Sequence, residues 1–372
     1  MMKQKVLIFH PTLAPYRIDF FNCLSKKFKT SFYFYLPNVV DQKFDQDKLK
    51  SKCEFNVQYL EKGFEFFGRS VRFGIRKIIR NEKPDIVICS EFNAVTILTY
   101  LYKRIYHKKY KLYTICDDSL DNASKRKGYR AVLRNFISKN IDGIILPSQE
   151  VCDWFKDHIS SNLNTLILPV IHNEQIFRKE LEKSLVAAND YILSENLEGK
   201  KIILYVGRLT AVKNLFFLLR VIARIKDDNY RLVIVGDGVL KQKLQNITTA
   251  LKIKDKVIFM GRKEEAALLA WYNVADIFVL PSTDEQFGAV VNEALLAGCY
   301  ILCSKRAGAS SIINSSNGRV FDPNNEDELL SFINEKLNQI EPIRIGKAQL
   351  RESKMPFTFT SILDTFLMQL EK

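Results

Sequence analysis

The chain is poor in the residues that build metal and disulfide sites. Only four of its 372 residues are histidines, and no two have the spacing of metal ligands, which argues against a zinc site. The seven cysteines are odd in number, scattered and without a C-x-x-C pair, as expected of reduced, mostly buried thiols in a cytosolic protein. The histidines are His10, His107, His158 and His172, and the cysteines are Cys23, Cys53, Cys89, Cys116, Cys152, Cys299 and Cys303.

Long hydrophobic runs are also missing. No apolar stretch approaches the ~18 residues that cross a bilayer, and Val6–Phe9 is too short for the apolar core of a signal peptide. There is no low-complexity tract and no repeat of 20 to 50 residues. With 47% hydrophobic and 26% charged residues, the chain is not disordered, collagen-like or a disulfide scaffold. Its length corresponds to about two domains, each large enough to bury a core.

The charge is basic and uneven. The chain has 56 Lys and Arg against 42 Asp and Glu, a net charge of +14. Residues 1–170 hold 29 cations against 17 anions, whereas residues 171–372 hold 27 against 25. Such a balance indicates polyanionic partners, and its asymmetry places them at the first half of the chain.

Short apolar runs rich in β-branched residues alternate with segments of helical periodicity. Runs such as Ile202–Val206 are typical of strands buried on both faces, and strand–helix alternation predicts parallel sheets. Two such series predict an α/β chain with two doubly wound, Rossmann-like domains. The expected strands are Val6–Phe9, Ser31–Leu36, Ile86–Cys89, Leu112–Cys116, Gly143–Leu146 and Leu166–Leu168, then Ile202–Val206, Arg231–Val235, Val257–Met260, Ile277–Leu280, Ile301–Ser304 and a short one near Val320.

The break between the two domains is expected between Pro169 and Lys200. This stretch is polar, with a short helix near Glu180–Ala188, as a linker would be. We therefore predict domains over residues 1–170 and 171–345. Residues 346–372 are expected to end in an amphipathic helix that packs back on the first domain.

The first candidate site follows the strand Ile202–Val206. Ligands of doubly wound sheets bind beyond the carboxyl ends of the strands, where this strand leads into Gly207. Arg208 and Lys213 then place two cations before a helix whose N-terminus offers unpaired N–H groups. Such a site suits a diphosphate. The alternative is a pair of solvated surface cations.

A second candidate follows the strand Ile277–Leu280, where a loop carries Glu285 and a helix opens near Gly288. A glycine there lets a phosphate approach the backbone N–H groups of Ala289 and Val290. Glu285 and Glu293 could accept hydrogen bonds from sugar hydroxyls. The alternative is one charge at a helix start and one solvated side chain.

These elements occur in one order that resembles a known family. The residues that carry the resemblance are Tyr205-Val-Gly-Arg208…Lys213-Asn, Val235-Gly-Asp-Gly-Val-Leu240, Phe259-Met-Gly261, Leu280-Pro-Ser…Glu285-x-Phe287-Gly-x-x-x-x-Glu293 and Asn317-Gly318-x-x-Phe321-x-Pro323. The order is similar to that of the GT-B glycosyltransferases of the retaining family 4, marked by an E-x7-E motif. The resemblance is strong over about residues 200–330 and looser before. It implies two Rossmann-like domains facing a central cleft.

The resemblance implies that the second domain binds a nucleotide-diphospho-sugar without a metal or other cofactor. Arg208 and Lys213 match the diphosphate-binding pair that stabilises the leaving group. Glu285 matches the carboxylate that faces the transferred sugar, and Glu293 the one that holds the ribose. The remaining donor-binding positions are Gly207, Gly236, Arg262, Phe287, Gly288, Ala289 and Val290, with the Gly236 and Arg262 turns bordering the base.

The first domain departs from the family pattern. Its first loop is His10-Pro-Thr-Leu-Ala-Pro-Tyr16-Arg17 where relatives have a Gly-Gly loop, and Tyr16 and Arg17 are candidates for acceptor or phosphate contacts. Where relatives carry a histidine near the donor sugar, this chain has Asp117, which we predict takes that catalytic role. Glu91 and Asp118 are further acceptor-side candidates. Asp45-Gln-Asp47 resembles a metal-binding D-x-D motif, but no strand leads into it, and we interpret it as surface charge.

Two stretches of the first domain concentrate the basic charge. Arg69, Arg72, Arg76, Lys77 and Arg80 interleave with apolar residues as in one amphipathic helix. Residues 100–111 mix tyrosines with cations. Such faces suit an anionic membrane surface. The alternative is ordinary exposed charge on helices that cover a sheet.

We therefore expect a cytoplasmic, retaining glycosyltransferase of the hexosyltransferase type at the inner face of the cell membrane. It would move a sugar from a nucleotide-diphospho-sugar to a glycan on a lipid pyrophosphate, for capsule or lipopolysaccharide synthesis. One rival is a nicotinamide-dependent oxidoreductase, but the G-x-G-x-x-G pattern fails because residue 241 is Lys. A nucleic-acid-binding protein is supported by charge alone, since no known motif of that kind is present.

Overall fold

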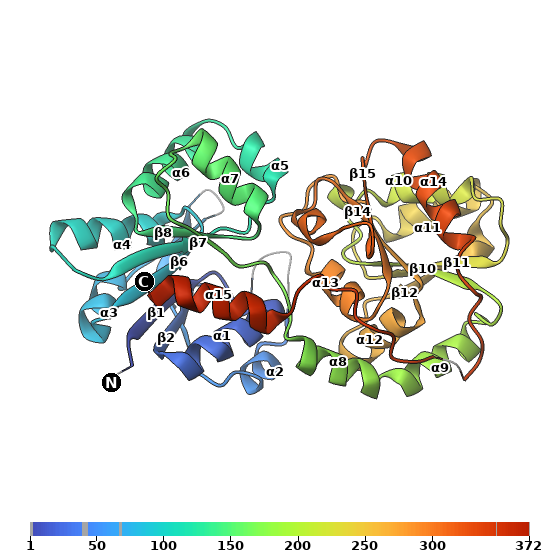
Figure 1. The fold of residues 1–372 in the computed structure, drawn as a ribbon, viewed down its shortest axis with the longest axis horizontal. Coiled ribbons are helices and arrows are strands. Elements are labelled where there is room, and N and C mark those ends of the chain that lie inside the picture. Colours follow the sequence, from blue (N-terminus) through green and yellow to red (C-terminus); the bar gives the residue numbers. More distant parts are fainter. Residues whose placement is uncertain (1–2, 39–43, 67–68, 347, 372) are drawn as a thin grey trace. The chain divides into compact units, whose positions relative to one another are not determined.

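The structure is a computed structural model that describes residues 3–38, 44–66, 69–346 and 348–371. The chain forms two compact units (Figure 1). Unit 1 consists of residues 1–118, 123–170 and 361–372, and unit 2 of residues 119–122 and 171–360. Both ends of the chain therefore belong to unit 1.

Unit 1 is built on a seven-stranded parallel sheet in the order β3-β2-β1-β6-β7-β8-β9. The strands predicted for the first half are all present, and β6 and β8 are buried along their whole length. The short edge strand β3 was not predicted. The strands are β1 (Lys5–His10), β2 (Lys29–Phe34), β3 (Val57–Tyr59), β6 (Ile86–Ser90), β7 (Lys111–Ile115), β8 (Gly143–Leu146) and β9 (Thr165–Ile167).

Helices cover both faces of this sheet. On one face, Phe21 of α1 packs on Phe32 of β2, with ring centroids 5.1 Å apart. On the other, Ile79 of α3 and Val95 of α4 share a buried cluster with Leu7 of β1. The helices are α1 (Pro15–Lys27), α2 (Gln46–Ser51), α3 (Ile75–Glu82), α4 (Ala94–Ile105), α5 (Leu120–Lys125), α6 (Tyr129–Asn140) and α7 (Gln149–His158). Asp45 caps α2 by accepting from the backbone N–H of Lys48, consistent with its interpretation as surface charge.

Unit 2 has a six-stranded parallel sheet in the order β12-β11-β10-β13-β14-β15, which matches the strands predicted for the second half. Its strands are β10 (Lys201–Val206), β11 (Tyr230–Val235), β12 (Val257–Gly261), β13 (Ile277–Leu280), β14 (Tyr300–Ser304) and β15 (Gly318–Phe321). Its helices are α8 (Glu174–Lys183), α9 (Leu185–Ser194), α10 (Leu215–Ala223), α11 (Lys241–Ala250), α12 (Glu265–Val274), α13 (Ala289–Leu296) and α14 (Glu326–Leu337), with 3-10 turns η1 (Ala211–Lys213), η2 (Lys254–Lys256) and η3 (Gly308–Ile312).

The stretch predicted to be a linker is an integral part of unit 2. It forms α8 and α9, which pack against α12. The side-chain amide of Asn273 donates to the carbonyl of Leu181 at 2.8 Å, and the rings of Tyr191 and Trp271 stack 4.6 Å apart. The polar outer faces of these helices gave the stretch its linker-like composition.

The predicted basic helix over residues 69–80 is wrong in its first part. Arg69–Arg72 form β5, which pairs in antiparallel fashion with β4 (Gly63–Phe66). Gly74, with a φ of +90°, then begins α3 at Ile75. The helix therefore keeps only Arg76, Lys77 and Arg80 of the predicted basic set.

The C-terminal segment leaves unit 2 at Thr360 rather than at the predicted residue 345. The Arg351 guanidinium fastens it to unit 2 by donating to the carbonyls of Tyr272 and Ala297 at 2.7 and 3.1 Å. The last helix, α15 (Phe359–Glu371), runs beside α1 in Figure 1, and the rings of Phe366 and Phe20 meet edge to face. α15 is thus part of the core of unit 1.

Two further expectations concern cysteines and membrane spans. All seven cysteines, each of which the structure describes, are free, and five of them are buried. Within the described ranges, no helix has both the length and the apolar character needed to cross a bilayer.

Candidate active site

Three glycine turns lie together at the carboxyl edge of the unit 2 sheet. Gly207, Gly236 and Gly261 end or follow the adjacent strands β10, β11 and β12, and the N–H of Gly236 donates to the carbonyl of Gly261 at 2.8 Å. A Cβ on Gly236 would lie 1.8 Å from the carbonyl oxygen of Gly207. These turns therefore pack backbone against backbone, which only glycine permits here.

The loop after β10 is tied to its neighbours at both ends. Tyr205 donates its hydroxyl to the carbonyl of Arg208 at 2.9 Å, and the backbone N–H of Thr283 donates to the carbonyl of Val212 at 2.8 Å. Asn214, in the left-handed region with a φ of +57°, closes the loop and begins α10. The hydrogen bond from Thr283 to Val212 thus joins the loops after β10 and β13, and it holds the two candidate sites next to each other.

Lys213 and Glu285 form an ion pair between these two loops. Their side chains are 12% and 17% exposed, and Ser282 donates a further hydrogen bond to Glu285 at 3.3 Å. Burial raises the pKa of Tyr205 above its ordinary range; the Glu285 carboxylate adds to this and Arg208 opposes it. The structure therefore joins Lys213 to Glu285, and the charges of Glu285 and Arg208 both act on Tyr205.

Gly288 sets the start of α13. Its φ is +94°, and a Cβ there would lie 2.8 Å from Cδ2 of Leu280. Ala289 and Val290 occupy the first turn of a helix that has no side-chain cap, so their N–H groups are available to an anion. Phe287, predicted to bind the donor, is buried in the core, and its carbonyl accepts from Ala309 at 2.7 Å. Phe287 anchors the loop from within.

Glu293, in the second turn of α13, is held by two residues that the sequence analysis did not single out. Tyr272 donates its hydroxyl to one carboxylate oxygen at 2.7 Å, and Nε2 of His172 lies 3.3 Å from the other. Burial and the Glu293 carboxylate raise the pKa of Tyr272 well above its ordinary range, so the phenol stays a donor. Glu293 itself is 17% exposed and keeps a face toward solvent.

We expect Tyr272→Phe to weaken donor binding without unfolding the protein. The ring still fills its place, but Glu293 loses the hydrogen bond that orients it, a loss of about 1 kcal/mol or roughly fivefold in KM. The change in KM is measured by steady-state kinetics with the nucleotide sugar that the thermal-shift screen described below selects. Tyr300→Phe, at a partly exposed tyrosine of β14, is the matched control. An unchanged KM in both variants would contradict a binding role for Glu293.

Arg262 is in the turn after β12. It pairs with Glu264 across 2.5 Å, with both side chains more than half exposed. Gly261 does bring the turn to the same edge as Gly236. The predicted contact of Arg262 with a base therefore remains a prediction.

In unit 1, Arg17, predicted to contact the acceptor or a phosphate, pairs with Asp117, predicted to be catalytic. Arg17 is only 1% exposed, whereas Asp117 is 22% exposed, and the contact of Arg17 with an acceptor or a phosphate stays a prediction. His10 beside them is buried, and burial together with the Arg17 charge lowers its pKa to about 4. Tyr16, on the first turn of α1, is half-buried. Of these residues, Asp117 and Tyr16 keep surface for a ligand.

Glu91 lies beside this pair, at the carboxyl end of β6. Its backbone has a φ of +64° and its carbonyl accepts from Thr96 and Thr114 at 2.7 and 2.9 Å. The backbone N–H of Asp117 donates to its carboxyl at 3.4 Å. Burial, with Asp118 and Asp117 nearby, raises the pKa of Glu91 to about 8. The Glu91 carboxyl therefore keeps its proton to a higher pH than an exposed glutamate does.

Asp118 and Cys116 complete this group. The ligand atoms of Glu91, Cys116 and Asp118 all lie within 4.8 Å of one another, a spacing that could hold a metal ion. Arg126, however, binds both oxygens of Asp118 at 2.6 and 2.5 Å. Burial raises the pKa of the Cys116 thiol well above its ordinary range. The Arg126 guanidinium thus balances the charge of Asp118.

We expect Glu91→Gln to remove a pH dependence of stability. The folded protein holds a proton on Glu91 that the unfolded chain releases above the ordinary pKa of 4.5. That stabilisation is complete below pH 4.5 and is lost as the pH rises to about 8. The melting temperature of the variant relative to the native protein should therefore rise between pH 5 and pH 8. A difference that stays constant over this range would contradict the assignment, and exposed Glu150→Gln is the control.

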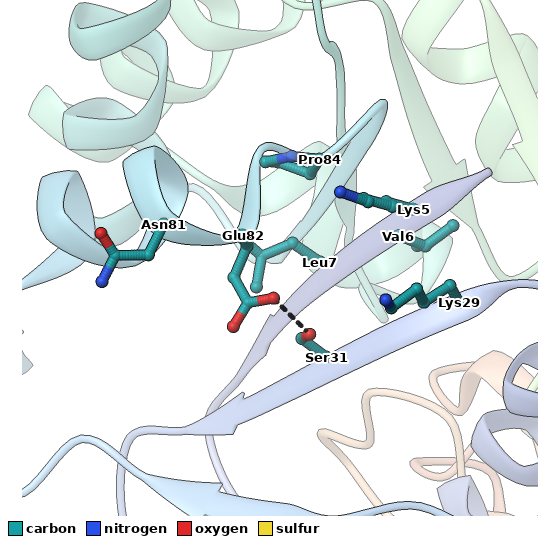
Figure 2. A pocket seen from close by; sticks show the side chains of 8 residues that line it. All are labelled: Lys5, Val6, Leu7, Lys29, Ser31, Asn81, Glu82 and Pro84. Carbon is teal, nitrogen blue, oxygen red and sulfur yellow. Dashed lines mark hydrogen bonds between the residues drawn. The ribbon is translucent and has the colours of Figure 1, made fainter.

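One cavity lies at the amino edge of the unit 1 sheet. It has a volume of about 160 Å3 and is lined at the amino ends of β1 and β2 by Lys5, Lys29 and Glu82, which accepts from Ser31 at 2.8 Å (Figure 2). Ligands of parallel sheets bind at the carboxyl edge instead. We therefore assign this cavity no part in the site.

Two doubly wound parallel sheets, one in each unit and each with candidate residues at its own carboxyl edge, make this a GT-B fold, as predicted. Residues 192–348 match the family model described as Glycosyl transferases group 1, and this segment holds all the unit 2 candidates. The crystal structure of Anabaena HepE in complex with UDP is similar over 99% of this chain and 100% of that one, with a TM-score of 0.77 and 15% identity.

Two curated relatives match part of the chain. An uncharacterized glycosyltransferase of Methanocaldococcus jannaschii is 36% identical over 134 residues, 36% of this chain and 34% of that protein. The N-acetylgalactosamine-N,N'-diacetylbacillosaminyl-diphospho-undecaprenol 4-alpha-N-acetylgalactosaminyltransferase of Campylobacter jejuni is 30% identical over 156 residues, 41% of each chain. The chain thus matches less than half the length of either relative.

Proposed function

We propose that this protein is a retaining glycosyltransferase of family 4, of the hexosyltransferase type, that uses a nucleotide-diphospho-sugar donor. The observation that carries the proposal is the Lys213–Glu285 pair beside the open N-terminus of α13. It unites a cation, a carboxylate and free N–H groups at one edge, which is what a sugar diphosphate needs. The family match over residues 192–348 supports the same function.

The geometry suggests how the donor is bound and its bond broken. The diphosphate accepts hydrogen bonds from Ala289 and Val290 and takes Lys213 away from Glu285, with Arg208 adding a second positive charge. These preorganised donors stabilise the negative charge that develops on the leaving diphosphate. Glu285, released from Lys213, accepts from hydroxyls of the transferred sugar. Glu293 holds the ribose, oriented by Tyr272.

We propose that no metal ion takes part, because Arg208, Lys213 and the helix N-terminus supply the positive charge that a divalent ion would otherwise give. The acceptor is proposed to bind unit 1 through Asp117 and Tyr16, with the carboxyl of Glu91 close to Asp117. Asp117 remains our candidate for the group near the donor sugar.

The acceptor is proposed to be a glycan on a lipid pyrophosphate, used for a bacterial capsule or lipopolysaccharide at the inner face of the cell membrane. The basic surplus of residues 1–170 favours a phosphorylated, membrane-bound partner. The Campylobacter relative, whose name includes a diphospho-undecaprenol, supports this class of acceptor.

A thermal-shift screen with UDP-, GDP-, dTDP- and ADP-sugars tests the function. We expect one nucleotide class to raise the melting temperature, and its sugar to be hydrolysed slowly or transferred without added metal and in the presence of EDTA. NADH and a DNA duplex serve as the comparison ligands. Stabilisation by NADH alone would favour an oxidoreductase, and steeply salt-dependent binding of DNA alone would favour a nucleic-acid-binding protein.

A further inference from the structure

The outer side of α4 carries an apolar stripe. Leu98, Leu101 and Ile105 are 42%, 42% and 64% exposed, and their i, i+3, i+7 spacing places them along one side of the helix. Val95 and Tyr102 of the same helix are buried against the sheet. α4 is therefore apolar on its solvent side as well as on its core side.

The helix α6 carries a second exposed apolar stripe, and its cation Arg134 is buried instead of exposed. Tyr129, Val132 and Phe136 have the same spacing and are 67%, 69% and 48% exposed. Its cation Arg134 points inward, donates to the carbonyl of Ala123 at 2.6 Å and lies 4.7 Å from the ring of Trp154. A helix that buries an arginine and exposes a phenylalanine is typical of a surface made for an apolar partner.

The two stripes belong to one face of unit 1. The rings of Tyr100 in α4 and Phe136 in α6 meet edge to face at 5.8 Å, and Tyr100 donates its hydroxyl to Asn140 at 3.2 Å. Figure 1 shows both helices on unit 1. We refer to the outer sides of α4 and α6 as the α4–α6 face.

Cations border this face. Residues 94–140 hold eleven Lys and Arg and three Asp. Two of those aspartates, Asp117 and Asp118, are paired with arginines. The exposed cations that follow α4 or flank the start and end of α6 are Lys108, Lys109, Lys125, Lys127, Arg130 and Lys139.

We propose that the α4–α6 face docks on an anionic phospholipid bilayer. Its apolar and aromatic side chains would enter the boundary between headgroups and acyl chains, and its cations would lie at the anionic headgroups. A second copy of this chain does not fit, because a symmetric contact through this face would set cations against cations. The inference deepens the proposed function and rests on it, since a lipid-linked acceptor lies at such a surface.

Vesicle co-sedimentation of the full chain tests the face, with vesicles of phosphatidylcholine alone and with phosphatidylglycerol added. We expect binding to the anionic vesicles only. Replacing Lys108, Lys109 and Lys127 by glutamine should weaken it roughly a hundredfold. The control replaces three exposed lysines of unit 2, Lys226, Lys243 and Lys254, and should bind as the native protein does.

A second variant removes apolar surface and leaves the charge unchanged. Ile105→Ser with Val132→Ser should weaken binding roughly tenfold. The control, Ile176→Ser with Val186→Ser, changes equally exposed residues of unit 2. Melting temperatures and nucleotide binding verify that each variant is folded.

The outcomes separate this inference from the proposed function. The docking face would be overturned if a unit 1 variant and its unit 2 control lost vesicle binding equally, or if the native protein did not bind anionic vesicles. It would also be overturned if the native protein formed a dimer that the Ile105/Val132 variant dissociates. Donor turnover measured in solution without vesicles decides the function independently. If the protein binds anionic vesicles but turns over no nucleotide sugar, the docking face is supported and the proposed function is contradicted.

Discussion

Lys213→Ala is expected to lower kcat/KM for donor turnover by roughly 10²–10³, the range seen when one preorganised donor to a developing anion is removed. The Lys213 side chain pairs with Glu285 and, in the proposed function, brings its charge to the diphosphate. Its loss also leaves Glu285 without its cation, so the carboxylate repels the donor that it should help to hold. Nucleotide affinity should fall by at least about tenfold.

Lys201→Ala is the matched control for this variant. Lys201 is 14% exposed against 12% for Lys213, and it too pairs with a carboxylate, that of Asp227 at 3.3 Å. It lies at the amino end of β10, away from the candidate site, so its loss should leave turnover and nucleotide binding unchanged. If Lys213→Ala and Arg208→Ala both retain native turnover and nucleotide affinity, the donor site is assigned to the wrong residues.

Gly236→Ala is expected to destabilise unit 2 by more than about 4 kcal/mol, the upper end of single substitutions. The new Cβ would lie 1.8 Å from the carbonyl oxygen of Gly207 and 2.9 Å from its carbon, and both are backbone atoms that no rotamer can move aside. The φ of +147° adds strain to the clash. Since domains are stable by only 5–15 kcal/mol, roughly a third or more of that stability is lost.

Urea unfolding followed by tryptophan fluorescence measures this loss in unit 2 alone. The chain has two tryptophans, Trp154 in unit 1 and buried Trp271 in unit 2, so the Trp154→Phe background reports on unit 2. Gly199→Ala is the control: its φ is +74°, but nothing lies within 4 Å of the added Cβ, and it should cost about 1 kcal/mol. Equal losses in the two variants would show that the close approach of the turns is not maintained in solution.

The strands could be predicted because the sequence marks them locally. Runs such as Ile202–Val206 are apolar throughout and end in glycine, and that pattern belongs to a buried parallel strand whatever surrounds it. The hairpin β4–β5 could not be predicted in the same way. Val71 and Ile75 follow one another at helical spacing, and only the pairing of Phe64 with Val71 and the left-handed Gly74 divide the segment into strand and helix.

The candidate site was predictable where one loop supplies it. Gly288, Glu285 and Glu293 lie within nine residues of one another, so their order is visible in the sequence. The partners of Glu293 were not predictable, because Tyr272 and His172 come from elements 21 and 121 residues away. The pairing of Arg17 with Asp117 was not predictable either, because 100 residues separate the two in the sequence.

The position of α15 has a consequence for synthesis of the protein. Phe366 and Leu370, from the last residues of the chain, are fully buried in unit 1, and Phe366 contacts Phe20. A ribosome makes the seven strands of unit 1 first but completes this core last, after the whole of unit 2 has emerged. Although domains generally fold in the order of their synthesis, here the second unit has its full set of strands before the first has its final helix. Throughout that interval the nascent first unit therefore exposes the apolar surface of α1 that α15 later covers.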